Sequence, residues 1–392
     1  MKYPYSSPNL HILDIFSALL LSNKKSEKRI KSYFSELTNK KYVLITNSCR
    51  SALYIAYKTL GVKGEVITSP LTCKVAIDPI IESGNEPVYA DISTSDLNIN
   101  PDDISHRVNK STIAIQVIHT GGIACDMERI MEIASKNNLY VIEDCAQSLG
   151  AIYRNKYTGE FGDISCYSLI KNAYGIGGGI FATNNYEHYE KASQFNTNLK
   201  KQSFKLLVYR IIRNVVDTKR RYYFFRKLFN ILLKLKGKKK SYRTVREQLR
   251  QVTLVEKKIV ARQIKKYPDL HRKRKYVGNK YINELKKLNI IKNNSHNHAD
   301  SSFTKLFVYN SDIDVIKYLS LLKNEGIEAM HLEHSWGSPY QERLVSEEQA
   351  TKLGLINYNK VHDSIISLPV TEYYTNEDID FICKALREIN DK

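Results

Sequence analysis

Between residues 42 and 185 the chain alternates short apolar stretches with segments of helical periodicity. Strands that alternate with helices in this way form a mostly parallel sheet with helices on both faces. This alternation predicts an α/β fold and a large domain over residues 1–200. The expected strands are 42–45, 65–70, 87–91, 112–119, 139–144, 164–170 and 179–183.

After residue 186 the pattern becomes helical and stays so over most of 247–290. We expect one helix over residues 9–38 before the sheet, and short strands after the long helical stretch. The second part of the chain is therefore expected to be a basic, amphipathic helical insertion at 201–247, followed by a connecting helix and a small α+β domain at 248–392. Its expected strands are 303–309, 326–330 and 367–370, and its expected helices are 312–324 and 376–389.

Positive charge is concentrated in one segment. The chain carries a net charge of +19, but residues 201–275 hold 26 Lys and Arg against four acids, an excess of +22, so the rest of the chain carries −3. Apolar and aromatic side chains lie between these cations. Such a pattern is typical of an interfacial helix, which predicts contact of 201–247 with an anionic membrane. A helical lid or a dimer contact with solvated charges explains the pattern equally well. Nucleic acid is not an expected partner, because no recognition motif accompanies the charge.

Composition is that of a soluble enzyme, with 42% hydrophobic and 26% charged residues. The sequence has no run of about 18 uncharged apolar residues and no signal-peptide pattern at its start, so we expect a cytoplasmic protein. Peripheral attachment to the inner face of the membrane is an open alternative to a protein free in the cytoplasm. Six cysteines form no C-x-x-C pair and no cysteine–histidine spacing suited to zinc. They are expected to be reduced thiols, and no metal is expected.

Two side chains suggest the chemistry. Asp144 ends an apolar strand, which is where open α/β sheets hold ligands. Lys171 follows the apolar segment 167–170 and precedes the glycine-rich turn 175–179. Burial lowers the pKa of an amine and glycines allow a ligand to approach closely, so Lys171 is expected to be a partly desolvated amine suited to Schiff-base chemistry.

Together these residues resemble the DegT/StrS type of pyridoxal-phosphate-dependent sugar aminotransferase. In that family an ED-x-AQ strand end is followed by a serine and then by Lys-Asn, and the chain has Glu-Asp-Cys-Ala-Gln at 143–147, Ser168 and Lys171-Asn172. The resemblance implies that Lys171 forms the Schiff base and acts as the base, and that Asp144 pairs with the pyridine nitrogen. It also implies that Gln147 orients the ring oxygen and that Ser168 contacts the phosphate.

Two further places are implied to bind the cofactor. Hydroxyl residues at 46–51 begin a helix, whose amino end suits a phosphate. Family members usually read S-x-G-T-A-A-L here, whereas this chain has Cys49 and Arg50 in place of the Gly-Thr pair, followed by Ser51. The Arg50 guanidinium is expected on the phosphate, with solvent as the alternative. Cys73 lies where an aromatic residue commonly stacks on the ring, and it is assigned to cofactor packing.

The resemblance further implies fold type I of the pyridoxal-phosphate enzymes and a homodimer with sites at the subunit interface. The chain departs from the family in two ways. It has no G-x-N-x-R stretch that crosses to the partner's site, and its spacing from Ser168 to Lys171 is two residues shorter than in most members. His119 is expected to be either a structural histidine at a strand end or a substrate contact, and His331 and His334 lie on the substrate side without an assigned role.

The implied activity is transfer of an amino group to a keto sugar that is nucleotide-linked, with glutamate as the donor, for surface polysaccharide or lipopolysaccharide biosynthesis. Two alternatives remain open. One is amination of a free acidic keto sugar. The other is a non-catalytic, membrane-associated or regulatory protein built on an aminotransferase scaffold.

Overall fold

The computed structural model describes residues 2–3, 5, 10–171, 175–201, 211, 243–286, 299–309, 314–335 and 343–390. The expected insertion at 201–247 lies mostly outside these residues, so its helical and amphipathic character remains a prediction.

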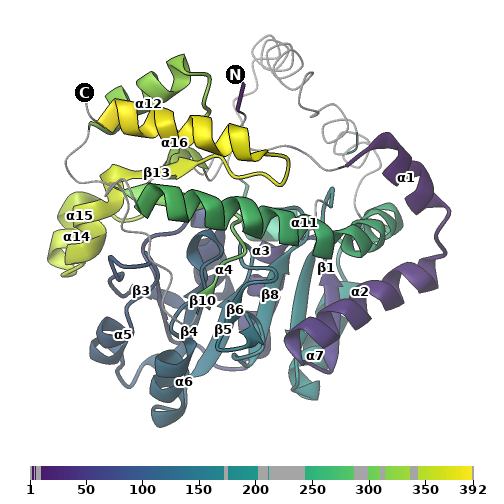
Figure 1. The fold of residues 1–392 in the computed structure, drawn as a ribbon. Helices are drawn as coiled ribbons and strands as arrows, with labels where there is room; N and C mark the ends of the chain where they lie inside the picture. The colour runs from purple at the N-terminus through teal and green to yellow at the C-terminus, as the bar shows by residue number, and fades with distance from the viewer. Residues whose placement is uncertain are drawn as a thin grey trace, which may run out of the picture.

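A seven-stranded sheet forms the centre of the first part of the chain (Figure 1). Its strand order is β1-β9-β8-β5-β4-β2-β3, and every neighbouring pair is parallel except the two made by β9. The predicted α/β fold with a mostly parallel sheet is confirmed. The strands are β1 (Tyr42–Thr46), β2 (Glu65–Thr68), β3 (Glu86–Tyr89), β4 (Thr112–Ile118), β5 (Tyr140–Asp144), β8 (Ile164–Ser168) and β9 (Gly179–Thr183).

Helices cover both faces of this sheet, because successive strand residues point to opposite sides. Ile142 of β5 packs in the cluster formed with α3, α4 and α7, whereas Val141 packs in the cluster formed with α5 and α6. α2 and the start of α11 cover β1, β8 and β9 on that second face. The helices are α2 (Asn23–Thr38), α3 (Cys49–Thr59), α4 (Lys74–Ser83), α5 (Pro101–Arg107), α6 (Met127–Lys136), α7 (Tyr186–Thr197), α10 (Val245–Gln248) and α11 (Leu254–Lys286).

The expectation of one helix over residues 9–38 is wrong. The structure has two helices, α1 (Ile12–Leu19) and α2, with a break between them. Ser22 is the N-cap of α2, and its hydroxyl accepts a hydrogen bond from the Lys25 N–H at 3.2 Å. A serine whose hydroxyl accepts a free backbone N–H in this way marks the start of a new helix. The apolar periodicity of residues 9–38 alone does not reveal this N-cap.

The second part of the chain builds a small unit around a three-stranded antiparallel sheet of order β11-β13-β12. Its expected strands exist, but they are displaced by a few residues from 303–309, 326–330 and 367–370. A separate small sheet joins β10 to the β6–β7 hairpin of the first part. The remaining elements are β6 (Ile152–Tyr153), β7 (Lys156–Tyr157), β10 (Ala299–Asp300), β11 (Leu306–Tyr309), α12 (Val315–Asn324), β12 (Met330–His331), α13 (Leu332–Ser335), α14 (Glu347–Lys352), α15 (Ile356–Val361), β13 (Ile365–Leu368), α16 (Asn376–Asn390) and the 3-10 turns η1 (Thr120–Gly122) and η2 (His362–Ser364).

The long helix α11 connects the two parts, as Figure 1 shows. Its first half packs on α1 and α2, and its second half packs on α16. Within that second half Gly278 lies directly against the ring of Phe303. A Cβ atom at Gly278 would come within 2.2 Å of the ring, and Phe303 is only 6% exposed, so the ring has little room to move.

Replacing Gly278 by alanine is therefore expected to destabilise the protein, although alanine favours helix by about 1 kcal/mol. Overpacking a buried contact costs about 1–3 kcal/mol, which exceeds that gain or cancels it. Urea denaturation checks the result, with Asn279→Ala on the exposed side of α11 as the control. If Gly278→Ala raised the stability as much as the control does, the tight contact with Phe303 would be refuted.

Candidate active site

The carboxyl ends of the central parallel strands meet at one edge of the sheet. In register, Ile118 of β4 pairs with Asp144 of β5, and Asp144 pairs with Cys166 of β8. Ser168, at the end of β8, pairs with Gly179 at the start of β9. This edge therefore collects Asp144, Ser168 and the turn that carries Lys171, as expected for a ligand site in an open α/β sheet.

Asp144 is fixed on the α3 face of the sheet. It is 5% exposed, and its Oδ1 accepts the N–H of Ala146 at 2.9 Å and the thiol of Cys49 at 3.7 Å. Burial raises the pKa of its carboxyl above the ordinary value, while the ammonium of Lys171 and the two hydrogen bonds offset part of that rise. The charge of Lys171 thus acts on the Asp144 carboxyl.

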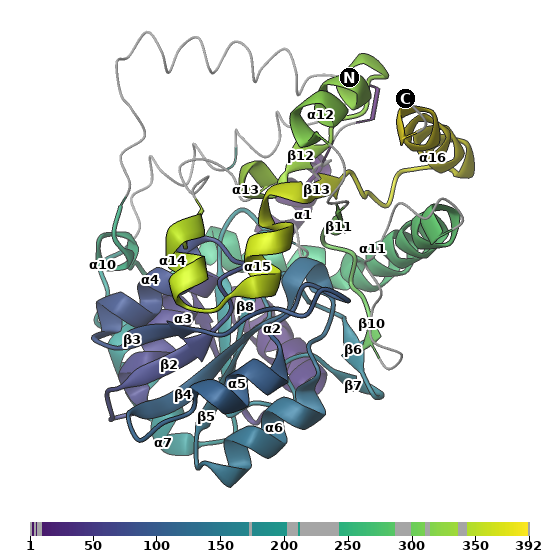
Figure 2. The same cartoon turned by 90° about the vertical axis from the view of Figure 1, so that its left-hand side faces the viewer.

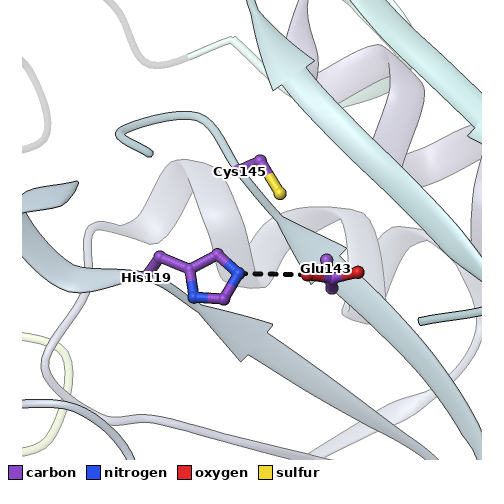
Figure 3. Close-up of side chains that lie close together, drawn as sticks. All are labelled: His119, Glu143 and Cys145. Atoms are coloured by element: carbon purple, nitrogen blue, oxygen red, sulfur yellow. Dashed lines mark hydrogen bonds and ion pairs between the residues drawn. The ribbon is translucent and has the colours of Figure 1, made fainter. Parts of the chain in front are cut away.

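Glu143, the neighbour of Asp144 in β5, points to the opposite face of the sheet and is fully buried. Its carboxylate lies beside His119 and the thiol of Cys145, and one potential ligand atom from each lies within 4.8 Å of the others (Figure 3). The histidine is already engaged on both nitrogens. Nδ1 accepts the N–H of Cys125 at 3.2 Å, so the proton is on Nε2, which donates to Glu143 at 3.3 Å. Burial raises the pKa of the Cys145 thiol, which keeps it protonated. This group therefore fits a structural role better than a metal site.

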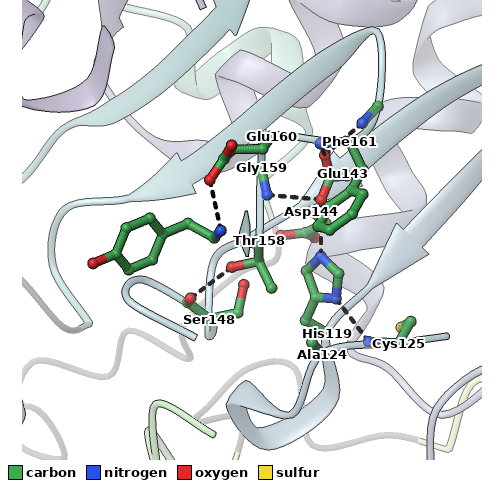
Figure 4. Close-up of polar contacts among 12 residues, drawn as sticks. His119, Ala124, Cys125, Glu143, Asp144, Ser148, Thr158, Gly159, Glu160 and Phe161 are labelled. Carbon is green, nitrogen blue, oxygen red and sulfur yellow. Dashed lines mark hydrogen bonds and ion pairs between the residues drawn. The ribbon is translucent and has the colours of Figure 1, made fainter. Parts of the chain in front are cut away.

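The same carboxylate organises the loop after β7. It accepts the backbone N–H groups of Gly159 at 2.7 Å, Phe161 at 3.0 Å and Gly162 at 2.6 Å (Figure 4). Burial opposes the charge of Glu143, but the hydrogen bond from His119, the charge of Lys40 and the N–H of Gly162 outweigh it and hold the pKa of Glu143 below its ordinary value. Glu143 thus ties β4, β5 and the 159–162 loop together beneath Asp144.

Glu143→Gln is expected to lower the free energy of unfolding by about 3 kcal/mol at neutral pH, because an amide group would face backbone donors in a buried place. A carboxylate with a depressed pKa stabilises the fold above its ordinary pKa of 4.5, and that stability is lost as the pH falls through the folded pKa. The difference between wild type and variant should therefore shrink in acid.

Urea denaturation at several pH values measures this difference. Glu160→Gln is the matched control, since Glu160 lies in the same loop and accepts a single backbone N–H, that of Tyr157. Glu160→Gln should lower the free energy of unfolding by no more than about 1 kcal/mol. Equal effects of the two substitutions, or a Glu143→Gln effect that grows in acid, would contradict the role assigned to Glu143.

The amino end of α3 lies at the site. Ser48 is its N-cap, and the Ser48 hydroxyl accepts the N–H of Ser51 at 3.1 Å and lies 2.9 Å from the Ser51 hydroxyl. Gly179 packs directly on this turn, since a Cβ there would come within 2.3 Å of the Ser48 carbonyl carbon. The absence of a side chain at Gly179 lets α3 begin next to the end of β8. The positive end of the helix dipole therefore lies at the edge that carries Asp144, which suits an anion.

The residues that replace the family's Gly-Thr pair point to different places. Cys49 contacts Asp144 through its thiol, whose pKa burial and the neighbouring carboxylate raise well above the ordinary value. Arg50 is 7% exposed, and its charge acts on Asp78 of α4. Burial raises the pKa of Asp78 to about 6, while Lys74 and Arg50 oppose that rise. Arg50 thus lies beside a carboxylate of α4, and its contact with a phosphate stays a prediction. Cys73 is the half-buried N-cap of α4 and likewise keeps only its predicted role in cofactor packing.

Lys171 lies three residues beyond the end of β8. The strand ends at Ser168, which is buried, and a turn carries the chain out through Ile170, which is 53% exposed, to the exposed Lys171. The expectation of a desolvated amine at a strand end is thus wrong for the isolated chain, because β8 is shorter than 164–170. Ser168 stays at the buried edge, and its proposed phosphate contact remains a prediction.

Gln147 lies where the first part of the chain meets the small unit. Its side-chain oxygen accepts the N–H of Gly121 at 3.2 Å, and its backbone carbonyl accepts the hydroxyls of Ser302 and Thr304. The N–H of Lys305 in turn donates to the Gly121 carbonyl at 3.0 Å. The residues that lead into β11, 302–305, therefore pack against the turns that follow β4 and β5. The site lies between the sheet edge and the small unit.

The model of the DegT/DnrJ/EryC1/StrS aminotransferase family matches residues 12–211 and 235–387. The chain belongs to this family. The family resemblance expected from the sequence is thus confirmed, over most of the chain.

Individual family members are similar over shorter stretches. The chain is 32% identical over 207 residues to GDP-perosamine synthase of Escherichia coli O157:H7, covering 50% of this chain and 57% of that protein. It is 32% identical over 198 residues to the spore coat polysaccharide biosynthesis protein SpsC of Bacillus subtilis, covering 48% and 51%. The chain thus spans little more than half the length of these relatives.

Solved structures of similar fold match nearly the whole chain. Helicobacter pylori PseC, an aminotransferase involved in the biosynthesis of pseudoaminic acid, matches with a TM-score of 0.72 and 21% identity over 99% of each chain. The structure of NtdA from Bacillus subtilis with bound cofactor PMP has a TM-score of 0.72 and 21% identity, over 97% of this chain and 82% of that one. At this identity the comparison shows the shared fold alone.

Sequence reasoning gave no role to several residues that shape the site. In the sequence Glu143 is only the first residue of the 143–147 motif, although its place one residue before Asp144 puts it on the opposite face of the same strand. That alternation was the available signal. Ser302 and Thr304 carried no signal, because they reach Gln147 from more than 150 residues away.

Proposed function

We propose that the protein is a pyridoxal-phosphate-dependent aminotransferase that converts a keto sugar to an amino sugar. The observation that carries this proposal is the buried Asp144 held at the end of β5, in register with β8, the strand that leads to Lys171. Membership of the aminotransferase family supports it.

The residues at the sheet edge suit the cofactor. Asp144 is a buried carboxylate whose Oδ1 is engaged by Ala146 and Cys49, a setting that suits a charge-assisted bond to a ring N–H. The amino end of α3, Ser51 and Ser168 offer a place for a phosphate. When bound, pyridoxal phosphate supplies an electron sink that lowers the barrier to removing a proton from the carbon bearing the amino group.

Each side chain then has a separate task. The Nζ of Lys171 would hold the cofactor and afterwards move the proton from the amino donor's α-carbon. Asp144 would keep the ring nitrogen protonated by accepting its N–H. Gln147 would orient the ring oxygen, and the closed approach to β11 would exclude water on that side.

A nucleotide-linked keto sugar is the proposed acceptor and glutamate the proposed donor, for surface polysaccharide or lipopolysaccharide synthesis. The names of the relatives support this, since they include GDP-perosamine synthase, a UDP-linked amino sugar transaminase and a spore coat polysaccharide protein. Amination of a free acidic keto sugar is the alternative, and mass spectrometry of products from a panel of keto sugars distinguishes the two.

The test of the cofactor chemistry uses the whole chain loaded with pyridoxal phosphate. Borohydride reduction followed by peptide mapping should place the cofactor label on Lys171, and addition of glutamate before reduction should abolish the labelling. A non-catalytic protein on an aminotransferase scaffold would show no loss of label with glutamate. Labelling at another lysine, or none, would refute the assignment.

We also propose a homodimer with the site at the subunit interface. Its support is the exposure of Ile170 and Lys171 at the edge that would carry the chemistry, since a second copy could cover both. Light scattering after size-exclusion chromatography should give twice the chain mass of 45.2 kDa. A monomer at micromolar concentration would contradict the dimer.

Peripheral contact with an anionic membrane is proposed for the same protein. None of the described helices combines the length and apolar composition that crossing a bilayer requires. Beside the basic charge of 201–247, support comes from α1 and the residue after it, where Leu13 is 79% exposed, Phe16 63% and Leu20 88%. These three lie at helical spacing and form one apolar face.

Sedimentation with vesicles of anionic lipid tests this contact. Binding should fall as salt rises, because the attraction is partly electrostatic. Phe16→Glu should weaken binding about tenfold or more, since it removes a buried aromatic side chain from the bilayer. The matched control is Ile316→Glu, at an apolar residue of α12 that is 83% exposed. No binding, binding that ignores salt, or equal effects of the two variants would count against the membrane contact.

A further inference from the structure

The chain engages only one of the two carboxylate oxygens of Asp144. Its Oδ1 accepts the N–H of Ala146 at 2.9 Å and the thiol of Cys49 at 3.7 Å. Among the described residues no hydrogen bond to Oδ2 is found, although Asp144 as a whole is only 5% exposed. An ionised carboxylate has lone pairs on both oxygens, so Oδ2 can accept a donor that the chain itself does not supply.

The two donors on Oδ1 come from different parts of the fold. Ala146 lies in the turn directly after β5, whereas Cys49 is the first residue of α3. α3 packs on both β5 and β8, and Figure 2 shows it beside β8. The terminal torsion of an aspartate is broad, so a carboxylate held by one donor can still turn. Two donors from separate elements restrict this rotation, because turning Oδ1 away from one of them also weakens its bond to the other.

The packing around α3 fixes the position of the Cys49 thiol. Cys49 is 8% exposed and belongs to the cluster of buried side chains between α3 and the sheet, which includes Cys166 of β8. Its backbone is held by β9, because a Cβ atom at Gly179 would come within 2.5 Å of the Cys49 nitrogen. The Cys49 side chain therefore has little room to turn away from Asp144.

Cys49 is a neutral donor to Asp144. Burial and the Asp144 carboxylate raise the pKa of the Cys49 thiol well above its ordinary value, and the charge of Lys171 opposes only part of that rise. A thiol is a weak donor, so it orients the carboxylate while withdrawing little of the negative charge that a ring N–H would require. The charges that act on Asp144 itself are those of Lys171 and, more weakly, His119. Lys171 thus acts on both the thiol and the carboxyl.

We propose that Cys49 is a positioning residue for Asp144, and that its S–H and the N–H of Ala146 together hold Oδ1 and leave Oδ2 to accept the ring N–H of the cofactor. The strength of a hydrogen bond depends on the direction of donor and acceptor. A contact that orients Oδ1 also orients Oδ2, because the two oxygens belong to one rigid planar group. The part of this proposal that concerns the cofactor rests on the proposed function, whereas the contact between Cys49 and Asp144 does not.

The first measurement uses the full chain without cofactor. The S–H stretch of Cys49 is the infrared difference between wild type and Cys49→Ala, in a spectral region where few other protein groups absorb. A hydrogen bond lowers the frequency of this stretch. In the Asp144→Asn background the band should move to higher frequency, because a neutral amide oxygen is a weaker acceptor than a carboxylate. Cys49→Ser also lacks this S–H and supplies the difference spectrum if circular dichroism shows that Cys49→Ala is unfolded.

The second measurement is the affinity of the apoprotein for pyridoxal phosphate, by fluorescence titration. Cys49→Ala should weaken binding about 2–10-fold, the effect of losing one weak hydrogen bond. Cys49→Ser should keep the affinity within about twofold of wild type, because a hydroxyl at this position can still donate. In the Asp144→Asn background Cys49→Ala should have no further effect, since the thiol then orients a group that no longer accepts the ring N–H.

Cys166→Ala is the matched control. Cys166 pairs in register with Asp144 and is buried in the same cluster as Cys49, but among the described residues no hydrogen bond joins its thiol to Asp144. Cys166→Ala should leave the affinity for pyridoxal phosphate unchanged. Wild-type protein that binds no pyridoxal phosphate would refute the proposed function, and the infrared spectra would then decide on the role of Cys49. An S–H band that Asp144→Asn does not move, equal losses of affinity in Cys49→Ala and Cys166→Ala, or no rescue by Cys49→Ser would overturn this proposal.

Discussion

Lys171→Ala is expected to lower kcat for amino transfer by about 10²–10⁴-fold, the usual contribution of a positioned proton-transfer group. The reason is that the amine would both hold the cofactor and carry the proton between donor and cofactor, and its charge lowers the pKa of Asp144 against the effect of burial. Steady-state rates with glutamate and a keto-sugar acceptor measure the effect, and borohydride should no longer attach the cofactor to the chain.

Lys110→Ala is the matched control, since Lys110 is an exposed lysine in a turn away from the site. It should change neither the rate nor the labelling. An added small amine should restore part of the Lys171→Ala activity, because it can take over the proton transfer. A variant that kept half of the wild-type rate, or that still became labelled, would show that a different side chain does this work.

Asp144→Asn is expected to have opposite effects on function and on stability. An amide cannot hold the ring nitrogen in its protonated state, and the loss of a charge-assisted bond of about 1.5–3 kcal/mol should weaken cofactor binding about 10–150-fold. Fluorescence or absorbance titration of the apoprotein with pyridoxal phosphate measures this change. The rate with saturating cofactor should fall as well.

The stability of the apoprotein should change in the other direction. Burial raises the pKa of Asp144 in the folded chain, so the folded state binds more protons than the unfolded state above the ordinary value of 3.8. Wild-type stability is therefore lost as the pH rises from that value through the folded pKa, and Asp144→Asn escapes this loss. The variant should gain stability relative to wild type as the pH rises toward neutral.

Urea denaturation of the wild-type and Asp144→Asn apoproteins, from the ordinary pKa of 3.8 to neutral pH, tests the sign of this stability difference. Glu132→Gln, at an exposed acid of α6, should show no such trend. If the variant were less stable than wild type near neutral pH, the buried charge of Asp144 would stabilise the apoprotein, which contradicts the expectation that it lowers the free energy of unfolding.

The alternation of strands and helices was enough to predict the large sheet, because its strands other than the edge strand β3 are largely buried on both faces and read as mostly apolar runs. It also placed Asp144 at the carboxyl edge, since Asp144 directly ends such a run. The predictions that were wrong concern the boundaries of individual helices and strands. The Ser22 N-cap divides residues 9–38 into two helices, and β8 ends at Ser168 instead of Ile170, which leaves Lys171 exposed.

Other features could not be predicted because they depend on tertiary contacts. The burial of Arg50 beside Asp78 depends on how α3 packs on α4, and short-range sequence patterns do not specify that packing. The contacts of Ser302 and Thr304 with Gln147 join segments that are far apart in the chain.

The continuous helix α11 limits how the protein can open. It is 33 residues long, about 50 Å at the usual rise, and is anchored to α1 and α2 at one end and to α16 at the other. A buried ion pair at 3.2 Å between Arg274 and Glu372 fastens its second half to the segment after β13. Within the described residues 254–286 this crossing is helical throughout and offers no flexible loop about which the small unit could rotate. Any hinge in α11 should lie at Pro268, because proline has no N–H and interrupts the backbone hydrogen bonds of the helix. Admission of a bulky substrate would therefore require bending at Pro268 or displacement of residues 299–305, which lead into β11.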